Sequence, residues 1–340
     1  MATSVYTVDE ERKTVWVYLE QTDGKLEGVA VELLGRARVL ADQAGWLLAG
    51  LVCGNEVGHL TEQALMHGAD EVWLADHPFL ADFTVEAYAH VAFSALMQGR
   101  PSVFLAGATP NGRDLASRLA VRLRTGLNAD CTDLRFDARR GILISEVTGF
   151  GGGVLALLEM PRHRPQMATV RSGVFPTEEP DPKRIGRVVK VPVDLPGEAI
   201  RTKVIERVRG QRVDLTQVRA LVCGGRGMNG DFSSLDHLAR LLGGEVGATR
   251  PAVDEGFVGR ERQVGQTGVV CRPKVAFACG ISGAFHFVVG IQNAGAVVAI
   301  NSDPEAPIFE FSDYCVVGDV SRIVPALIEA IESQREAAHA

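Results

Sequence analysis

The sequence has no surplus of positive charge. Its 35 Lys and Arg residues are outnumbered by 42 Asp and Glu residues, which gives a formal net charge of -7 and a pI near 5.7. Binding to a nucleic-acid backbone needs a concentrated positive face. The composition therefore argues against a nucleic-acid partner.

Long apolar runs are also missing. The longest nearly uncharged run, residues 275–302, is interrupted by several glycines and by the polar His286 and Asn293. A helix that spans a bilayer needs about 20 mainly apolar residues, so we expect no membrane insertion. Residues 1–13 lack the basic start and apolar stretch of a secretory signal and are too acidic for a mitochondrial presequence. We therefore expect a cytoplasmic protein.

Paired cysteines and catalytic motifs are absent as well. The six cysteines form no C-x-x-C pair, and each lies in or beside an apolar run: Cys53, Cys131, Cys223, Cys271, Cys279 and Cys315. We expect reduced, packed thiols and no metal site. The sequence has no G-x-S-x-G elbow, H-E-x-x-H motif or Walker A loop. It therefore predicts no catalytic acid, base or nucleophile.

The first half alternates apolar strands with helix-period segments. We expect strands at Thr14–Leu19, Trp46–Cys53, Glu71–Ala75 and Ser102–Ala106, and helices at Leu33–Ala44, Leu60–His67, Val85–Met97 and Arg113–Arg124. This alternation predicts an α/β domain with a mainly parallel sheet flanked by helices. A chain of 340 residues is long enough for two such domains.

The pattern changes after about Val170, where prolines fall among charged residues. Such a segment is typical of an extended crossing stretch without a packed helix. We place the boundary near residue 205, with residues 1–205 as the N-terminal α/β domain and linker and residues 206–340 as the C-terminal domain. The second half predicts a doubly wound domain with strands at Arg219–Cys223, Val275–Cys279, Val297–Asn301 and Tyr314–Val317 and helices at Phe232–Leu242 and Val320–Arg335.

Unusual loops follow the strands of the second half, at Gly224–Gly227, Cys279–Ala284, Asn301–Pro304 and Gly318–Asp319. The carboxyl ends of parallel strands meet at one sheet edge, where such folds hold ligands, so these loops should converge. Gly280, Ser282 and Gly283 lie between a strand and a helix, where small residues and free N–H groups suit a pyrophosphate. A tight turn is the alternative, because the full G-x-G-x-x-G fingerprint is missing.

Asn301 and Asp319 also follow predicted strands. An amide and a carboxylate at this edge suit the hydroxyl and amino groups of a nucleotide, although each residue alone is a common helix cap or turn former. Two further polar clusters, Thr249–Asp254 and Gln263–Gly268, have few apolar anchors. They are either functional loops or simply solvated ones.

Several of these segments together resemble a known protein family. Gly224–Gly227, Val264–Gly268, Gly280–Ala284 and above all Ala299–Phe309 resemble the FAD domain of the electron-transfer flavoprotein alpha subunit. The resemblance is strong over residues 206–335. It is weaker in the first domain, where it depends on Gly107–Thr109, Gly112–Ala116 and Leu127–Asp130.

The resemblance implies a cradle for one FAD. Arg226 and Arg250 would lie against the isoalloxazine ring, where positive charge favours reduced flavin. Gln266 and Thr267 would bond the ring edge near N5. The rest of the implied cradle consists of Thr249, where the family usually has serine, Val264 and Gly265 beside the ring, Ser282, Gly283 and Ala284 on the pyrophosphate, and Asn301 and Asp319 on the adenosine.

One segment departs from the family pattern. After the Gly-Ala pair the family usually has an apolar residue, glutamine and histidine, whereas this chain has Phe285, His286 and Phe287. The imidazole therefore comes one position early, a rotation of about 100° on a helix. Phe287 would replace the histidine that contacts the flavin's pyrimidine carbonyl. For His286, contact with the flavin and a plain helix-surface position both remain open.

The resemblance also implies partners. The N-terminal domain would bind no FAD and would be the platform for an electron-transfer flavoprotein beta subunit. The complex would exchange electrons with an acyl-CoA dehydrogenase-type or quinone-reductase-type partner. The rival hypothesis is a nucleotide-binding (NAD) regulatory or deacetylase-like protein, which would not require the ring-facing pair Arg226 and Arg250.

The segment His163–Arg171 resembles the electron-bifurcating members of the family. In those members a second FAD, held mostly by the beta subunit, accepts two electrons from NADH and splits them between two acceptors. Arg171 would reach toward that second flavin and tune it by its charge. The alternative is that Arg164 and Arg171 pair with carboxylates near the domain boundary.

Overall fold

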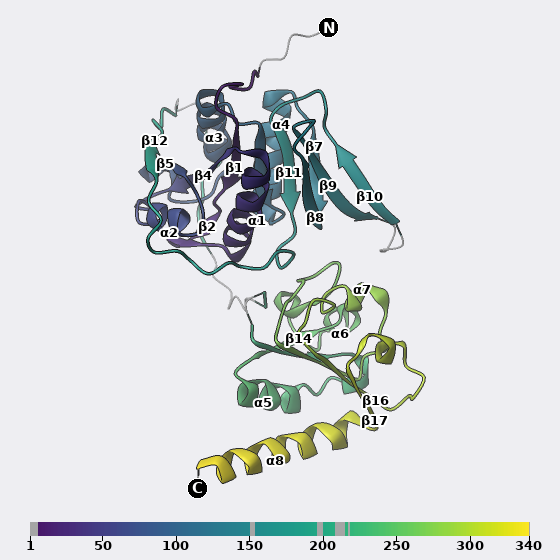
Figure 1. Cartoon of the computed structure of the whole chain (residues 1–340). Coiled ribbons are helices and arrows are strands. Elements are labelled where there is room, and N and C mark those ends of the chain that lie inside the picture. Colours follow the sequence, from purple (N-terminus) through teal and green to yellow (C-terminus); the bar gives the residue numbers. More distant parts are fainter. Residues whose placement is uncertain (1–5, 150–153, 196–199, 208–214, 217, 340) are drawn as a thin grey trace. The chain divides into compact units, whose positions relative to one another are not determined.

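The structure is a computed structural model that describes residues 6–149, 154–195, 200–207, 215–216 and 218–339. The chain divides into two compact units, Met1–Val208 and Arg209–Ala340, each built on a parallel sheet (Figure 1). No helix in the described ranges combines the length and apolar character that crossing a membrane requires.

The N-terminal unit contains a seven-stranded sheet in the order β12-β5-β4-β1-β6-β11-β7, with every pairing parallel. Its strands are β1 (Thr14–Tyr18), β4 (Leu47–Gly54), β5 (Glu71–Asp76), β6 (Val103–Gly107), β7 (Leu127–Cys131), β11 (Gln166–Val170) and β12 (Arg187–Lys190). In β1, Val15 and Val17 join one buried cluster, while Trp16 and Tyr18 join the other. Both faces of the sheet are therefore covered, as expected for parallel strands.

Helices cover the two faces in pairs. α1 (Gly28–Ala44) and α2 (Leu60–Met66) supply Leu33 and Leu60 to one cluster, and α3 (Val85–Gly99) and α4 (Pro110–Leu123) supply Ala92 and Leu119 to the other. From β1 the chain moves through β4 to β5 on one side and then to β6 on the other. The strand order thus reverses between β1 and β6. The predicted parallel α/β fold is confirmed.

Some elements of the N-terminal unit were not predicted. β8 (Asp133–Asp137), β9 (Ile142–Gly149) and β10 (Val154–Glu159) form a separate antiparallel sheet. β2 (Gln21–Thr22) and β3 (Lys25–Leu26) form a small ribbon, and η1 (Pro78–Leu80) is a short 3-10 turn. The described residues 171–195 contain no helix, as expected, but β12 within them adds a strand to the edge of the main sheet.

The C-terminal unit is a five-stranded, fully parallel sheet in the order β14-β13-β15-β16-β17. Its strands are β13 (Ala220–Gly224), β14 (Glu245–Ala248), β15 (Val275–Cys279), β16 (Val297–Asn301) and β17 (Tyr314–Val317). α5 (Ser233–Leu242) and α8 (Val320–His339) pack on one face, and α7 (Phe285–Val288) packs on the other. The remaining short elements are α6 (Arg250–Asp254), η4 (Arg226–Met228), η5 (Arg260–Arg262) and η6 (Pro307–Phe311).

The cysteines follow the strand positions. Five are buried, whereas Cys315 is exposed. The expectation of packed thiols is therefore wrong for Cys315. The reason is that β17 is the edge strand of its sheet and exposes three of its four side chains.

Candidate functional site

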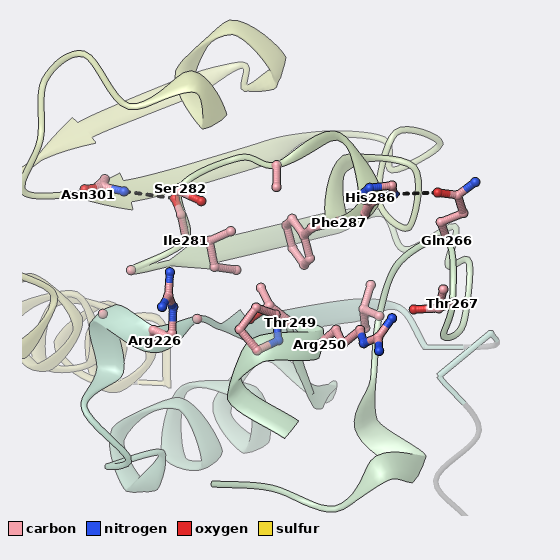
Figure 2. Close-up of a pocket in the computed structure, with 16 residues that line it drawn as sticks. Arg226, Thr249, Arg250, Gln266, Thr267, Ile281, Ser282, His286, Phe287 and Asn301 are labelled. Carbon is pink, nitrogen blue, oxygen red and sulfur yellow. Dashed lines mark hydrogen bonds between the residues drawn. The ribbon is translucent and has the colours of Figure 1, made fainter. Parts of the chain in front are cut away.

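A cavity of about 640 Å³ opens at the carboxyl edge of the sheet in the C-terminal unit. The strand order of this sheet reverses between β13 and β15, because β14 lies on one side of β13 and β15 on the other. Open α/β sheets hold ligands at such a reversal, where the loops after adjacent strands diverge. The cavity lies between these loops (Figure 2).

Most of the residues that the sequence singled out line this cavity. They are Arg226, Thr249, Arg250, Val264, Gln266, Thr267, Ser282, Ala284, His286, Phe287 and Asn301. Gly265 and Gly283 are their chain neighbours but do not line it themselves, and neither does Asp319. Gly280, which the sequence placed in the expected pyrophosphate loop, lines it too. Gly225, Gly227, Pro251 and Ile281 also line it and lie within the loops that the sequence singled out, although none of them was chosen as a site residue.

Glycines let the loops after β13 and β15 touch. The amide of Gly227 donates to the Gly280 carbonyl at 3.1 Å, and a Cβ on Gly225 would overlap the same carbonyl. Gly280 itself has a φ of +60°, which side chains other than glycine rarely adopt. The loops can approach this closely only with glycine at these positions.

The loop after β15 keeps its N–H groups free while its carbonyls are bound. Ile308 N donates to Ser282 O at 3.0 Å, and Asn301 Nδ2 donates to Ile281 O at 2.9 Å. Within the described part of the chain, the amides of Ser282, Gly283 and Ala284 donate no hydrogen bond. Successive free amides form a concave site for an anion. This loop therefore has the chemistry of a phosphate cradle.

The helix expected after this loop is a single turn. α7 covers only Phe285–Val288, so the free amides of this loop belong to the loop itself and not to the first turn of a long helix. The cluster at Thr249–Asp254 differs from the expected loop in the opposite way. Arg250–Asp254 form the short helix α6, and the buried Thr249 is the N-cap residue that precedes it.

The opposite end of the cavity is formed by Val264–Gly268 and α7. Gln263 Nε2 donates to Thr267 Oγ1 at 2.9 Å, which fixes that hydroxyl at the cavity wall. Gln266 N donates to His286 O at 2.7 Å, and His286 Nδ1 lies 2.6 Å from Gln266 Oε1. Phe287 is 5% exposed and packs into the core beneath. The imidazole therefore meets Gln266, and the phenyl ring occupies the neighbouring wall.

The two arginines lie on different loops. Arg226 follows β13 and adjoins the Gly280 turn, whereas Arg250 begins α6 after β14. Figure 2 shows Arg226 near Ile281 and Ser282, and Gln266 and Thr267 at the far end of the cavity. Arg226 forms no ion pair among the described residues, while the exposed Arg250 pairs with Asp254 at 3.3 Å. The positive charge is thus spread along the cavity.

Asp319 has a structural partner. Its Oδ1 accepts hydrogen bonds from Ser321 N at 2.9 Å and from Ser321 Oγ at 2.8 Å, at the start of α8. The Ser321 hydroxyl and then its amide lower the pKa of this carboxyl. β17 is two strands beyond β15, which explains why Asp319 does not line the cavity. Its role at the adenosine stays a prediction.

Arg171 belongs to the N-terminal unit, where it follows β11 and donates its amide to Cys131 O at 3.1 Å. Its Nη1 is buried and has no hydrogen-bond partner in the described ranges. Arg164 instead donates to carbonyls, including His163 O at 2.9 Å. Neither arginine forms an ion pair among the described residues, so the carboxylate alternative has no support there.

The sheet, the strand-order reversal and the amide-lined loop define the C-terminal unit as a dinucleotide-binding domain. The family profile described as Electron transfer flavoprotein domain matches residues 15–196, and the profile of the Electron transfer flavoprotein FAD-binding domain matches residues 214–292. The chain belongs to the electron-transfer flavoprotein alpha-subunit family, and its cofactor is FAD. Membership of this family does not favour the NAD hypothesis.

Named relatives span nearly the whole chain. An electron transfer flavoprotein subunit alpha from Thermoanaerobacterium thermosaccharolyticum is 44% identical and covers 94% of this chain and 98% of its own. Protein FixB from Clostridium saccharobutylicum is 42% identical over 93% and 95% of the two chains. The acryloyl-CoA reductase electron transfer subunit beta from Anaerotignum propionicum is 38% identical over 96% and 97%.

Proposed function

We propose that this chain carries one FAD in a heterodimer with an electron-transfer flavoprotein beta subunit. The complex would relay electrons to or from an acyl-CoA dehydrogenase-type or quinone-reductase-type partner. The observation that supports this most is the cavity at the strand-order reversal, with its free amides at one end and its polar cluster of Gln266 and Thr267 at the other. The relative from Anaerotignum propionicum, which is named as an electron transfer subunit of an acyl-CoA reductase, favours a partner of the acyl-CoA type.

FAD, when bound, supplies the capacity to take up and release electrons singly or in pairs. The chain's own residues bind and orient it. The amides of Ser282, Gly283 and Ala284 would hold the pyrophosphate, and Asn301 would lie by the adenosine. Thr249, Arg250, Gln266 and Thr267 would surround the ring. Positive charge from Arg250 would favour added electrons there.

The test is to purify the full chain with its beta subunit and to measure bound FAD and its reduction by a reduced acyl-CoA dehydrogenase. We expect one FAD in this chain, reduced in a rapid second-order reaction. A colourless complex that NAD saturates would overturn the proposal. A flavinated complex that exchanges electrons with neither type of partner would overturn the carrier role alone.

We place the beta-subunit interface on the N-terminal unit because β10 leaves an apolar edge uncovered. Val154, Leu155, Leu157 and Leu158 are 49%, 54%, 57% and 37% exposed, on a strand that pairs on one side with β9. Open apolar edges promote aggregation unless another chain covers them. We expect the double change Leu155→Ser and Leu157→Ser to weaken the heterodimer. Val121→Ser, on a still more exposed apolar residue of α4 (78%), should leave it intact.

A second proposal is that the complex bifurcates electrons from NADH. The observation that favours it is Arg171, whose buried Nη1 has no partner and which pairs with no carboxylate in the described ranges. Arg171 follows a strand end and is only partly buried, so the exposed part of its side chain would be available to a flavin held by another chain. The test is to count flavins in the heterodimer. Two FAD reducible by NADH would support bifurcation, whereas one FAD plus AMP and no reduction by NADH would refute it.

A further inference from the structure

His286 and Gln266 are joined by two hydrogen bonds that run in opposite directions. The amide of Gln266 donates to the His286 carbonyl at 2.7 Å, and the His286 imidazole Nδ1 lies 2.6 Å from Gln266 Oε1. Both residues line the cavity, and Figure 2 shows their side chains pointing at each other. The loop that contains Gln266 and the helix α7 are thus joined at one end of the cavity.

Glycines allow the backbones on the two sides of this contact to approach closely. Gly265 has a φ of +131°, and a Cβ on it would overlap the His286 carbonyl. A Cβ on Gly290 would overlap the backbone of Gly265 in turn. Because both sides of the contact are bare backbone, the loop at Gly265 seats directly on α7. This seating brings Gln266 within reach of the imidazole.

In the side-chain hydrogen bond, the imidazole is the donor and the amide oxygen of Gln266 is the acceptor. With Gln266 Oε1 facing the imidazole, the bond forms in the tautomer that has the proton on His286 Nδ1, because an amide oxygen accepts hydrogen bonds and does not donate them. The bond therefore holds Gln266 by its oxygen and leaves its NH2 group as the free, donating part. Gln266 Nε2 has no other hydrogen-bond partner within the described part of the chain.

Position 287 holds a phenyl ring, so no imidazole is available there to contact the flavin directly. The Phe287 ring is buried, at 5% exposure, in the core cluster with Val264 and Ile291. His286 is exposed and directed to Gln266 instead. In this chain the imidazole thus acts on another side chain of the cavity.

We propose that His286 is a positioning residue that orients the Gln266 amide, so that Gln266 presents a hydrogen-bond donor to the polar edge of the flavin ring. This role rests on the proposed FAD site. Donation to the ring edge stabilises the negative charge that reduction adds. Loss of the imidazole donor should therefore weaken FAD binding and make the midpoint potential of the bound FAD more negative.

The experiment uses the full chain in complex with its beta subunit and compares His286→Leu, His286→Asn, Gln266→Ala and the double variant His286→Leu with Gln266→Ala. Asparagine places an N–H donor close to the position of Nδ1. We expect His286→Leu to weaken FAD binding about five- to tenfold, the size of one hydrogen bond, and to lower the midpoint potential. His286→Asn should stay within about twofold of the wild type, because it restores that bond. The double variant should match Gln266→Ala, since coupled residues are not additive.

Three results would overturn the positioning role: a His286→Leu variant with unchanged affinity and potential, a His286→Asn variant as impaired as His286→Leu, or additive effects in the double variant. Thermal unfolding of the apo variants detects a folding defect. A folding defect that accounted for the loss of FAD would also overturn the positioning role. Failure of the wild-type complex to bind FAD would refute the proposed function itself. Normal FAD binding in the wild type and in every variant would refute the positioning role alone.

Discussion

Both units reverse their strand order beside their first strand, between β1 and β6 in the N-terminal unit and between β13 and β15 in the C-terminal unit. At the first reversal the polar groups bind one another. Thr109 Oγ1 donates to Glu20 Oε2 at 2.5 Å and accepts from Gly112 N at 2.9 Å. At the second reversal, the amides of Ser282, Gly283 and Ala284 have no acceptor among the described residues.

The cavities at the two sheet edges differ in the same way. The N-terminal unit has a pocket of about 340 Å³, where Arg207 pairs with Asp23 at 2.9 Å and His59 Nε2 lies 2.8 Å from Gly24 O. The C-terminal cavity is about 640 Å³ and keeps Arg226 outside any ion pair in the described ranges. The sheet thus supplies the position for a ligand, and the loops decide whether polar groups remain free to bind it.

The largest effect on FAD binding should come from a substitution that distorts the loop of residues 282–284, which carries the free amides. Gly283 has a φ of +95°, and a Cβ there would overlap Ile308 N, the donor to Ser282 O. We expect Gly283→Ala to weaken FAD binding about 100-fold, or about 2.7 kcal/mol, measured by titration of the apoprotein. Gly243→Ala is the matched control, because φ is +64° but nothing lies within 4 Å of its Cβ. Equal losses in both variants would mean that backbone strain, and not the loop, is responsible.

The N-terminal unit should respond to a change at Asp70 without any effect on FAD. Asp70 accepts from Leu48 N, Arg38 Nη1 and Arg184 Nη2, each at 2.8 Å. We expect Asp70→Asn to cost about 2 kcal/mol of stability, seen in thermal unfolding of this unit. Asp42→Asn removes the more exposed partner of Arg38 and should cost less than about 0.5 kcal/mol.

The Asp70 effect should depend on pH. Burial alone would raise the pKa of this carboxyl, but the Leu48 amide, Arg38 and Arg184 together lower it below its ordinary value of 3.8. A depressed pKa stabilises the fold above the unfolded value, and this stabilisation is lost as pH falls through the folded value. The stability curves of wild type and Asp70→Asn should converge as the pH falls through the lowered pKa of Asp70. A gap between the curves that stays constant throughout the acid range would show that the charge is not the cause.

Changes at the two arginines of the cavity should have different effects, one on the affinity for FAD and the other on the midpoint potential of the bound FAD. Arg226 adjoins the amide loop, so Arg226→Ala should weaken FAD binding about tenfold, the scale of a lost charge-assisted bond. Arg250 begins α6 at the other side, so Arg250→Ala should mainly make the midpoint potential more negative. Potentiometric titration checks both. An equal fall in potential for Arg226→Ala would mean that both arginines lie against the ring, as the family resemblance implies.

The smallest effect concerns the exposed thiol. Burial raises the pKa of Cys53 and Cys279 to about 12 and, as the largest cause, that of Cys131 to about 11. At pH 8 the native protein should therefore bind one equivalent of a thiol reagent, at Cys315, with no loss of FAD. Cys315→Ser should bind none. Labelling of a second cysteine in the native state would show that one of the buried strands opens.

Much of the fold could be predicted because buried parallel strands are short apolar runs separated by helices. Val275–Cys279, Val297–Asn301 and Tyr314–Val317 match the structure at both ends. The antiparallel strands β8, β9 and β10 were missed, as were β7 and β11 of the main N-terminal sheet and β14 of the C-terminal sheet. β14 has only four residues, Glu245–Ala248, and its strand character comes from pairing with β13. Pairing of this kind is non-local and leaves little trace in composition.

The sequence by itself determined the apolar runs, the glycines at the strand ends and the polar residues beside them, because these depend on the chemistry of neighbouring residues. The tertiary structure decided which of them meet. Asn301 reaches the cavity and Asp319 does not, since β16 is one strand from β15 while β17 is at the edge. His286 meets Gln266 across twenty residues because two glycines let their backbones touch. Strand order and close backbone approach are set by packing over the whole sheet, which no local pattern contains.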